Sequence, residues 1–228
     1  DPEMRILGEH CWGGHGELCV VPAHQLERRP EGRTWVDSVA YPVGATTAYR
    51  LLRRARVQAG DTVLVTGIGG GVATFALLLA IRMGARVFVT SRDEEKRKRA
   101  VELGAEDGFD SAGPYPVRAD VVVDSIGPAT WDQAIRSLRH GGRMCVCGGT
   151  TGTSVELDLP RLFFKQLEVI GATAGSQEEF RHVTGLMEDG LPVVLDEVLP
   201  LEEYPHALER LRCGAQLGKL VLEHPVRP

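Results

Sequence analysis

Apolar runs of two kinds alternate along residues 62–90. Residues 62–66 form a short Val-rich run, which is typical of a strand buried on both faces. Residues 72–83 are apolar for about three turns, as expected for a helix that packs on a sheet, and Gly84 ends this run. Residues 86–90 form a second β-branched run. The pattern therefore predicts a strand–helix–strand unit of about 30 residues.

The same alternation continues to residue 190. It predicts further strands at residues 108–110, 119–124, 142–147 and 167–172, and helices at residues 93–103, 128–138 and 177–188. Six strands that alternate with helices predict an α/β fold with a doubly wound parallel sheet. Ligands of such sheets lie beyond the carboxyl ends of the strands, here at the turns that begin at Gly67, Ser91, Ser125 and Gly148.

The two ends of the chain do not follow this alternation. The first part predicts a strand at residues 17–21, a short helix at 35–41 that Pro42 breaks, and a basic helix at 47–56. The tail predicts a strand, a helix and a strand at residues 194–199, 201–212 and 218–222. Because such a tail would not extend a complete doubly wound sheet, we expect it to return to the fold that holds residues 1–44.

A glycine-rich turn lies between the first predicted strand and its helix. It contains Gly67, Gly69, Gly70 and Gly71, and Val72 begins the helix. Glycine lets the backbone approach a pyrophosphate closely, and the N–H groups at the helix start face the anion. Since the turn follows a strand and opens a helix, as the phosphate-binding motif requires, we expect residues 45–193 to form a dinucleotide-binding Rossmann domain.

The end of the second strand bears on which dinucleotide binds. A site for NAD usually has Asp or Glu about 20 residues after the glycines, whereas that residue is Ser91 here. Arg92 and Lys96 supply cations nearby, so we expect NADPH, whose 2′-phosphate a carboxylate would repel. Two alternatives need no ligand: Ser91 and Glu94 match a helix capping box, and residues 96–99 match a solvated basic helix face.

Composition narrows the class of protein. The chain has 228 residues, 43% hydrophobic content and a formal net charge of −5, with no long basic block that would favour nucleic acid as a partner. No uncharged apolar stretch reaches the length of a membrane span, and no signal peptide leads the chain, so we expect no membrane partner and a cytoplasmic location. Five cysteines do not indicate a disulfide scaffold. Cys145 and Cys147 alternate to one face of their strand, so they cannot bond to each other and are expected to be packed.

A cluster of cysteines and histidines near the start of the chain is a candidate metal site. It comprises Cys11, His15 and Cys19, with His10 and His24 nearby. Their spacing matches neither the C-x₂-C nor the zincin pattern, and a strand at residues 17–21 would not bring His15 to the face of Cys19. We therefore predict no metal here and interpret the two thiols as core residues beside a glycine turn.

Several segments together resemble a known enzyme family. They are residues 16–22 (GELCVVP), 46–50 (TTAYR), 63–73, 96–105, 124–127 (DSIG), 138–149, 163–176 (FFKQLEVIGATAGS) and 217–222 (LGKLVL). In this order they resemble the medium-chain dehydrogenase/reductase superfamily, closest to its quinone oxidoreductase and enoyl reductase branch. They span nearly all of the chain, which makes them far more specific than the glycine turn alone.

The resemblance implies a GroES-like lobe beside the Rossmann domain, and here a partial one, β-rich and formed by residues 1–44 and 194–228. Members of the superfamily carry a long further segment before the position that matches Asp1, and this sequence lacks it. The cysteine that alcohol dehydrogenases use as a zinc ligand before the TTAY-like helix falls at Val43, which cannot ligate zinc. The resemblance therefore implies a zinc-independent reductase.

The resemblance also implies a function and further cofactor contacts. The expected function is an NADPH-dependent oxidoreductase that passes hydride to an activated alkene or to a quinone, both small-molecule substrates. Thr47 would lie near the nicotinamide, Gly148 and Gly149 near its ribose, and Lys219 would approach the cofactor from the tail. Each residue also has an alternative role that needs no cofactor: a helix N-cap for Thr47, a plain turn for Gly148 and Gly149, and a surface cation for Lys219. No general acid is identified. A second hypothesis is a non-catalytic subunit that senses nucleotides or binds a partner.

The strand at residues 167–172 (LEVIGA) raises the question of assembly. We expect it to be the last strand of the sheet, with one edge unpaired and only Glu168 as a charge. A homodimer in which this strand pairs with its own copy would cover the edge, and the resembling family often does this. The alternative is that residues 194–199 cover the edge within one chain.

Overall fold

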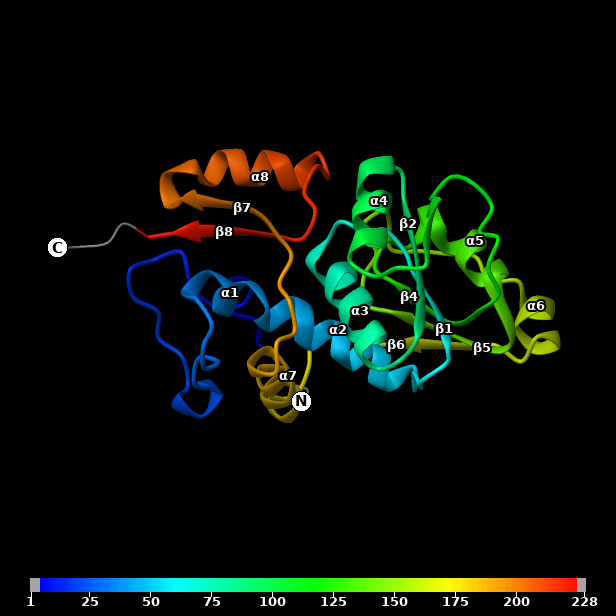
Figure 1. The fold of residues 1–228 in the computed structure, drawn as a ribbon, viewed down its shortest axis with the longest axis horizontal. Coiled ribbons are helices and arrows are strands. Elements are labelled where there is room, and N and C mark those ends of the chain that lie inside the picture. Colours follow the sequence, from blue (N-terminus) through cyan, green and yellow to red (C-terminus); the bar gives the residue numbers. More distant parts are fainter. Residues whose placement is uncertain (1–4, 225–228) are drawn as a thin grey trace.

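The computed structural model describes residues 5–224, and its main feature is one six-stranded sheet (Figure 1). All pairings in it are parallel, and the strand order is β3-β2-β1-β4-β5-β6, which is the Rossmann order. The strands are β1 (Thr62–Val65), β2 (Arg86–Ser91), β3 (Asp107–Asp110), β4 (Ala119–Asp124), β5 (Leu138–Val146) and β6 (Glu168–Gly171). The predicted doubly wound α/β fold is confirmed.

Helices cover both faces of this sheet. They are α2 (Pro42–Arg54), α3 (Gly71–Arg82), α4 (Glu94–Glu102), α5 (Pro128–Ser137), α6 (Leu159–Phe164) and α7 (Gln177–Glu188). Along β4, Val121 and Val123 face a core shared with α2, α3 and α7, whereas Val122 faces a second core with α5. This alternation explains why the strands are apolar on both faces, since each face is buried under helices.

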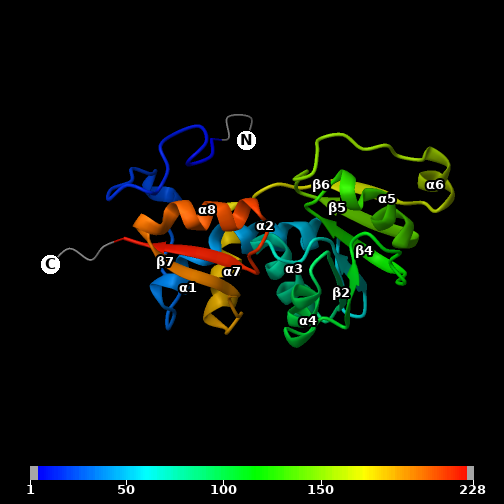
Figure 2. The same cartoon turned by 90° about the horizontal axis from the view of Figure 1, so that it is seen from above.

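The tail forms a separate two-stranded parallel sheet, β7 (Leu195–Pro200) and β8 (Lys219–Glu223). Between these strands lie a short 3₁₀ turn (Leu201–Glu203) and α8 (Tyr204–Arg212). Helix α1 (Trp35–Ala40) packs against β8, so the tail lies beside α1, at the opposite end of the molecule from α5 and α6 (Figure 2). The division into a domain of residues 45–193 and a lobe of the two ends stays a prediction.

Three predictions for the first part of the chain need correction. Residues 17–21 form no strand, and Leu18 and Val20 are 92% and 97% exposed, so these apolar side chains do not pack as a strand in a sheet would require. Helix α2 begins at Pro42 rather than at residue 47, because proline suits the first turn of a helix. Cys11 and Cys19 are exposed and are not core thiols. Sequence reasoning also missed α6 and the 3₁₀ turn Ala23–Gln25.

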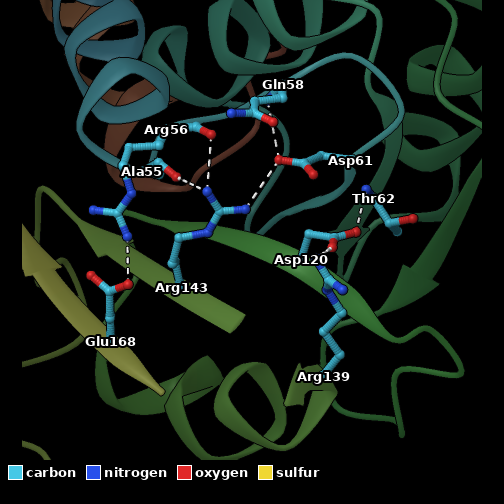
Figure 3. A network of polar contacts seen from close by, with 9 residues as sticks. All are labelled: Ala55, Arg56, Gln58, Asp61, Thr62, Asp120, Arg139, Arg143 and Glu168. Atoms are coloured by element: carbon cyan, nitrogen blue, oxygen red, sulfur yellow. Dashed lines mark hydrogen bonds and ion pairs between the residues drawn. The ribbon is translucent and has the colours of Figure 1, made fainter. Parts of the chain in front are cut away.

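An arginine ties helix α2 to the amino-terminal edge of the sheet (Figure 3). The Arg143 guanidinium donates to the carbonyl oxygens of Ala55 at 2.7 Å and Arg56 at 2.9 Å, just after α2 ends, and to Asp61 Oδ2 at 3.1 Å. A cation is favourable at a helix carboxyl end, where the backbone carbonyls lack partners. The same network pairs Arg56 with Glu168 of β6. Contacts within the protein therefore occupy the amino-terminal ends of the strands, and the carboxyl-terminal ends are left for a ligand.

Strand β6 is the last strand of the sheet, as predicted. Among residues 5–224 it pairs only with β5, and Val169 on it is 42% exposed. The alternative that residues 194–199 cover this edge is wrong, because β7 pairs with β8 in the other sheet. No helix of the described chain is long and apolar enough to cross a membrane.

Candidate functional site

The glycine-rich turn connects β1 to α3 at the carboxyl edge of the sheet. Gly67 has φ of +65° and lies so close to Ile126 that a Cβ atom would collide with that side chain. The Gly67 amide donates to Thr90 Oγ1 at 3.1 Å, which fixes the turn to the end of β2. Gly70 is the N-cap of α3 and supplies no capping side chain. The first N–H groups of this helix therefore remain available to an anion.

Lys219 brings a positive charge to the same helix start. It comes from β8, and its Cδ lies 2.6 Å from the position that a Cβ on Gly71 would occupy, so only glycine allows this approach. Its side chain makes no hydrogen bond or ion pair with any other residue of the described chain. Burial lowers the pKa of Lys219. An unpaired, desolvated ammonium beside open helix N–H groups indicates a site for an anion. The alternative that Lys219 is a surface cation is therefore disfavoured.

The structure does not contain the capping box predicted after β2. Ser91 is 7% exposed, and its hydroxyl accepts a hydrogen bond from the Asp93 amide at 3.1 Å. Asp93, not Ser91, caps α4, because its carboxylate accepts from the amides of Glu95 at 2.9 Å and Lys96 at 3.3 Å. The Ser91–Glu94 capping box is wrong for this reason.

The predicted basic face of α4 is only partly solvated. The Lys96 ammonium donates to the Gly214 carbonyl in the tail, and burial lowers the pKa of Lys96. The Arg97 guanidinium donates to the Ser91 carbonyl at 2.6 Å, whereas Lys98 is an exposed side chain paired with Glu94 and Glu95. Arg92 is exposed and makes no hydrogen bond or ion pair with another described residue. Of the two predicted cations, Arg92 is thus the one that is free.

A cavity of about 940 Å³ opens beside the glycine turn. It brings together six predicted residues: Thr47, Gly70, Gly71, Val72, Ser125 and Gly148. The other predicted residues, Gly67, Gly69, Ser91, Arg92, Lys96, Gly149 and Lys219, lie outside its lining. Gly149 packs against Gly152, which supports the alternative that this residue forms a plain turn.

Sequence reasoning missed most of the cavity wall. The wall also contains Ile6, Glu9, His24, Gln25, Val43, Thr46, Cys147, Phe180 and residues 173–177. Burial raises the pKa of the Cys147 thiol to about 11, so this side chain is a neutral wall of the cavity at pH 7. The signal that could have found residues 173–177 is their place just after β6, at the carboxyl edge of the sheet.

A buried carboxyl group holds the turns around the cavity in place, and the sequence analysis did not predict it as a site residue. Asp124 ends β4, is 0% exposed, and accepts hydrogen bonds from Thr66 Oγ1 at 2.5 Å, Thr130 Oγ1 at 2.8 Å and the Gly127 amide at 2.8 Å. Thr66 precedes Gly67, and Gly127 follows the cavity residue Ser125. Asp124 therefore fixes two neighbouring turns relative to each other.

The cluster considered as a metal site is dispersed. His10 Nδ1 accepts a hydrogen bond from the Ile6 amide, and the His15 ring packs edge-on against Tyr204. Within residues 5–224, no three His, Cys, Asp or Glu side chains gather in a way that could hold a metal ion. All five cysteines are free thiols, and Cys145 and Cys147 pack on the same core as predicted.

Comparison with known proteins connects this geometry to a family. Residues 71–189 match the zinc-binding dehydrogenase family. The chain is 33% identical to acryloyl-coenzyme A reductase from Metallosphaera sedula, over 92% of this chain and 65% of that protein. It is 28% identical to quinone oxidoreductase from Homo sapiens, over 92% of this chain and 69% of that protein. The chain thus spans about two thirds of the length of these relatives.

Solved structures agree with this match. An NAD-dependent alcohol dehydrogenase superposes with a TM-score of 0.91 and 31% identity, over 97% of this chain and 68% of that chain. The 2-octenoyl-CoA carboxylase reductase CinF, solved with NADP and 2-octenoyl-CoA, superposes with a TM-score of 0.89 and 26% identity. That superposition covers 98% of this chain and 58% of CinF.

Proposed function

The chain belongs to the zinc-binding dehydrogenase family of the medium-chain dehydrogenase/reductase superfamily, and on this premise we propose that it is an NADPH-dependent oxidoreductase. It would transfer hydride to an activated alkene or to a quinone. The observation that carries the proposal is the unpaired Lys219 ammonium beside Gly71, at the open start of α3 and next to a cavity of about 940 Å³. A cavity of this volume suits a ligand of cofactor size.

The residues fit a nicotinamide dinucleotide. Gly67, Gly69, Gly70, Gly71 and Val72 would hold the diphosphate on backbone N–H groups, with Lys219 as its counter-charge. Ser91, Arg92 and Lys96 would surround the adenosine half. Thr47, Ser125 and Gly148 of the cavity wall would surround the nicotinamide half, with Gly149 next to Gly148 in the same turn. The cofactor would supply hydride, and the protein would orient it and exclude water.

The relatives support the acceptor class without fixing one substrate. Acryloyl-coenzyme A reductase, quinone oxidoreductase and CinF, which was solved with an enoyl thioester, are named for alkenes conjugated to a carbonyl or for quinones. The cavity wall here is largely apolar or neutral, with Val43, Thr46, Phe180 and the neutral Cys147 thiol in it. Such a wall suits a neutral acceptor better than a charged one.

The test is NADPH oxidation, followed at 340 nm with a panel of enones, enoyl thioesters and quinones. Turnover with one class of acceptor supports the enzyme. Tight NADPH binding without turnover of any acceptor would instead favour the second hypothesis, a subunit that senses nucleotides or binds a partner.

We also propose that the reaction needs no zinc, although the family is named for it. Val43 lines the cavity at the position where alcohol dehydrogenases place a cysteine ligand, and its side chain has no lone pair to donate. Metal analysis of the purified protein should find less than one zinc per chain. One stoichiometric zinc that is lost with Cys11→Ser or Cys19→Ser would contradict this prediction.

We further propose a homodimer in which β6 pairs with β6 of a second copy. The edge of this strand is free among the described residues, and Val169 on it is 42% exposed. Sedimentation at micromolar concentration should find a dimer. Ile170→Pro should split it, because proline removes a backbone donor and collides with the partner strand.

A second variant separates loss of pairing from loss of folding. Val169→Lys places a charge on the exposed edge and keeps every backbone donor, so it should also give a monomer while the melting temperature of the chain changes little. A wild-type monomer at micromolar concentration would defeat the proposed dimer.

A further inference from the structure

Two buried side-chain oxygens have no hydrogen-bond partner within residues 5–224: Thr46 Oγ1 and Gln216 Oε1. Buried polar atoms are nearly always paired, because an unpaired one loses its bonds to water without replacement. Both lie near the proposed cofactor site, which calls for an explanation that involves a ligand.

Thr46 is the fifth residue of α2 and is 7% exposed. A threonine inside a helix commonly donates to a carbonyl one turn earlier, as Thr74 does to Gly70 and Thr184 does to Phe180. Thr46 does not. Its methyl group packs against Gly175, where a Cβ atom would collide with it, and this contact restricts rotation of the side chain. The hydroxyl is therefore held unpaired in a residue that lines the cavity.

Gln216 lies over the other side of the glycine turn. Its backbone carbonyl oxygen is 3.2 Å from the position that a Cβ on Gly69 would occupy, and the Lys96 ammonium is 3.3 Å from that same position. The Gly218 amide donates to the Gly69 carbonyl at 2.8 Å, which fastens the tail to the turn. The backbone of Gln216 is thus placed beside Gly69 and Lys96, and its side chain carries the unpaired Oε1.

We propose that these two oxygens are completed by opposite halves of the dinucleotide, an inference that rests on the proposed function. Thr46 Oγ1 can both donate and accept, which matches the carboxamide of the nicotinamide half. Gln216 Oε1 can only accept, which matches a ribose hydroxyl of the adenosine half. The bound cofactor thereby satisfies both atoms that the apoprotein leaves unpaired.

The test uses fragments of the cofactor. NADPH, reduced nicotinamide mononucleotide and 2′,5′-ADP are titrated against the wild type, Thr46→Val and Gln216→Met. Each variant should weaken NADPH binding roughly tenfold, the effect of one lost hydrogen bond that leaves a polar group unpaired. Thr46→Val should weaken the nicotinamide fragment alone, and Gln216→Met should weaken 2′,5′-ADP alone. Thr46→Ser, which keeps the hydroxyl, should restore binding.

The melting temperature of the apoprotein separates cofactor binding from a purely structural role. If Thr46 and Gln216 only stabilised the fold, replacing either would lower this temperature. Both variants remove an unpaired buried atom, so both should melt at the wild-type temperature or above it. Unchanged NADPH affinity, equal weakening of both fragments, or a lower melting temperature would overturn the inference. If the wild type binds none of the three ligands, the proposed function itself is wrong. If the wild type binds them and the variants bind them equally well, only the inference about Thr46 and Gln216 is wrong.

Discussion

NADPH is expected to bind the wild type at least tenfold more tightly than NADH, and Ser91→Asp should reverse that preference. Ser91 ends β2, where NAD sites carry the carboxylate that binds the ribose 2′-hydroxyl. Asp at this position would accept from that hydroxyl and repel a 2′-phosphate. Arg92 is exposed and has no partner in the described chain, so it is available to pair with the phosphate.

Fluorescence titration of both cofactors measures this preference. Arg92→Ala should lower the affinity for NADPH and leave NADH unchanged. Arg99→Ala is a matched control, because Arg99 is an exposed cation on α4 that pairs with Glu102. Equal affinities of the wild type for NADPH and NADH would refute the assignment. Lys96 is expected to contribute less than Arg92, because its ammonium already donates to the Gly214 carbonyl.

The core of the fold could be predicted because each buried strand is marked by an apolar run in the local sequence. Residues 119–124 read as one Val-rich run, and β4 has these bounds, since a parallel strand covered by helices is apolar on both faces. Helix α7 likewise has the predicted bounds, Gln177–Glu188, and the structure shows that a Ser176–Glu179 capping box fixes its start.

Residues 17–21 show where such a signal fails. Their composition suits a strand, but an isolated strand is not stable without packing, and Leu18 and Val20 are exposed. Pro42 shows a second limit. The same residue that ends α1 begins α2, so reading it only as a helix breaker shortened the second helix by a turn.

The candidate site could be predicted only where one local motif builds it. The glycine turn is such a motif, and the structure places Gly70, Gly71 and Val72 in the cavity wall. Lys96 was predicted to be a cation facing the cofactor, yet it donates to Gly214, which lies 118 residues later in the chain. The wall at residues 24–25 arises from the same kind of long-range packing, which no local spacing encodes.

Asp124→Ala is expected to lower the free energy of unfolding by about 3–4 kcal/mol. The Asp124 carboxyl group is fully buried and accepts from two threonine hydroxyls and one amide. Its removal leaves the buried amide without a partner and the hydroxyls with only long contacts, to the Val123 carbonyl at 3.4 Å and the Gly127 carbonyl at 3.3 Å. These donors are on Thr66, Gly127 and Thr130. The loss should therefore free the glycine turn and the Ser125 turn together, and cofactor affinity should fall along with stability.

Urea unfolding followed by circular dichroism measures the change, with the m-value checked for constancy. Asp110→Ala is the matched control. Asp110 also ends a strand of the same sheet, but it is exposed, and within residues 5–224 its carboxylate accepts only from the Ala112 amide, so its loss should cost less than about 1 kcal/mol. If Asp124→Ala were as mild as this control, the three hydrogen bonds would not hold the two turns together. Asp124→Asn should fall in between, because an amide keeps the shape and one acceptor but presents a donor to groups that must themselves donate.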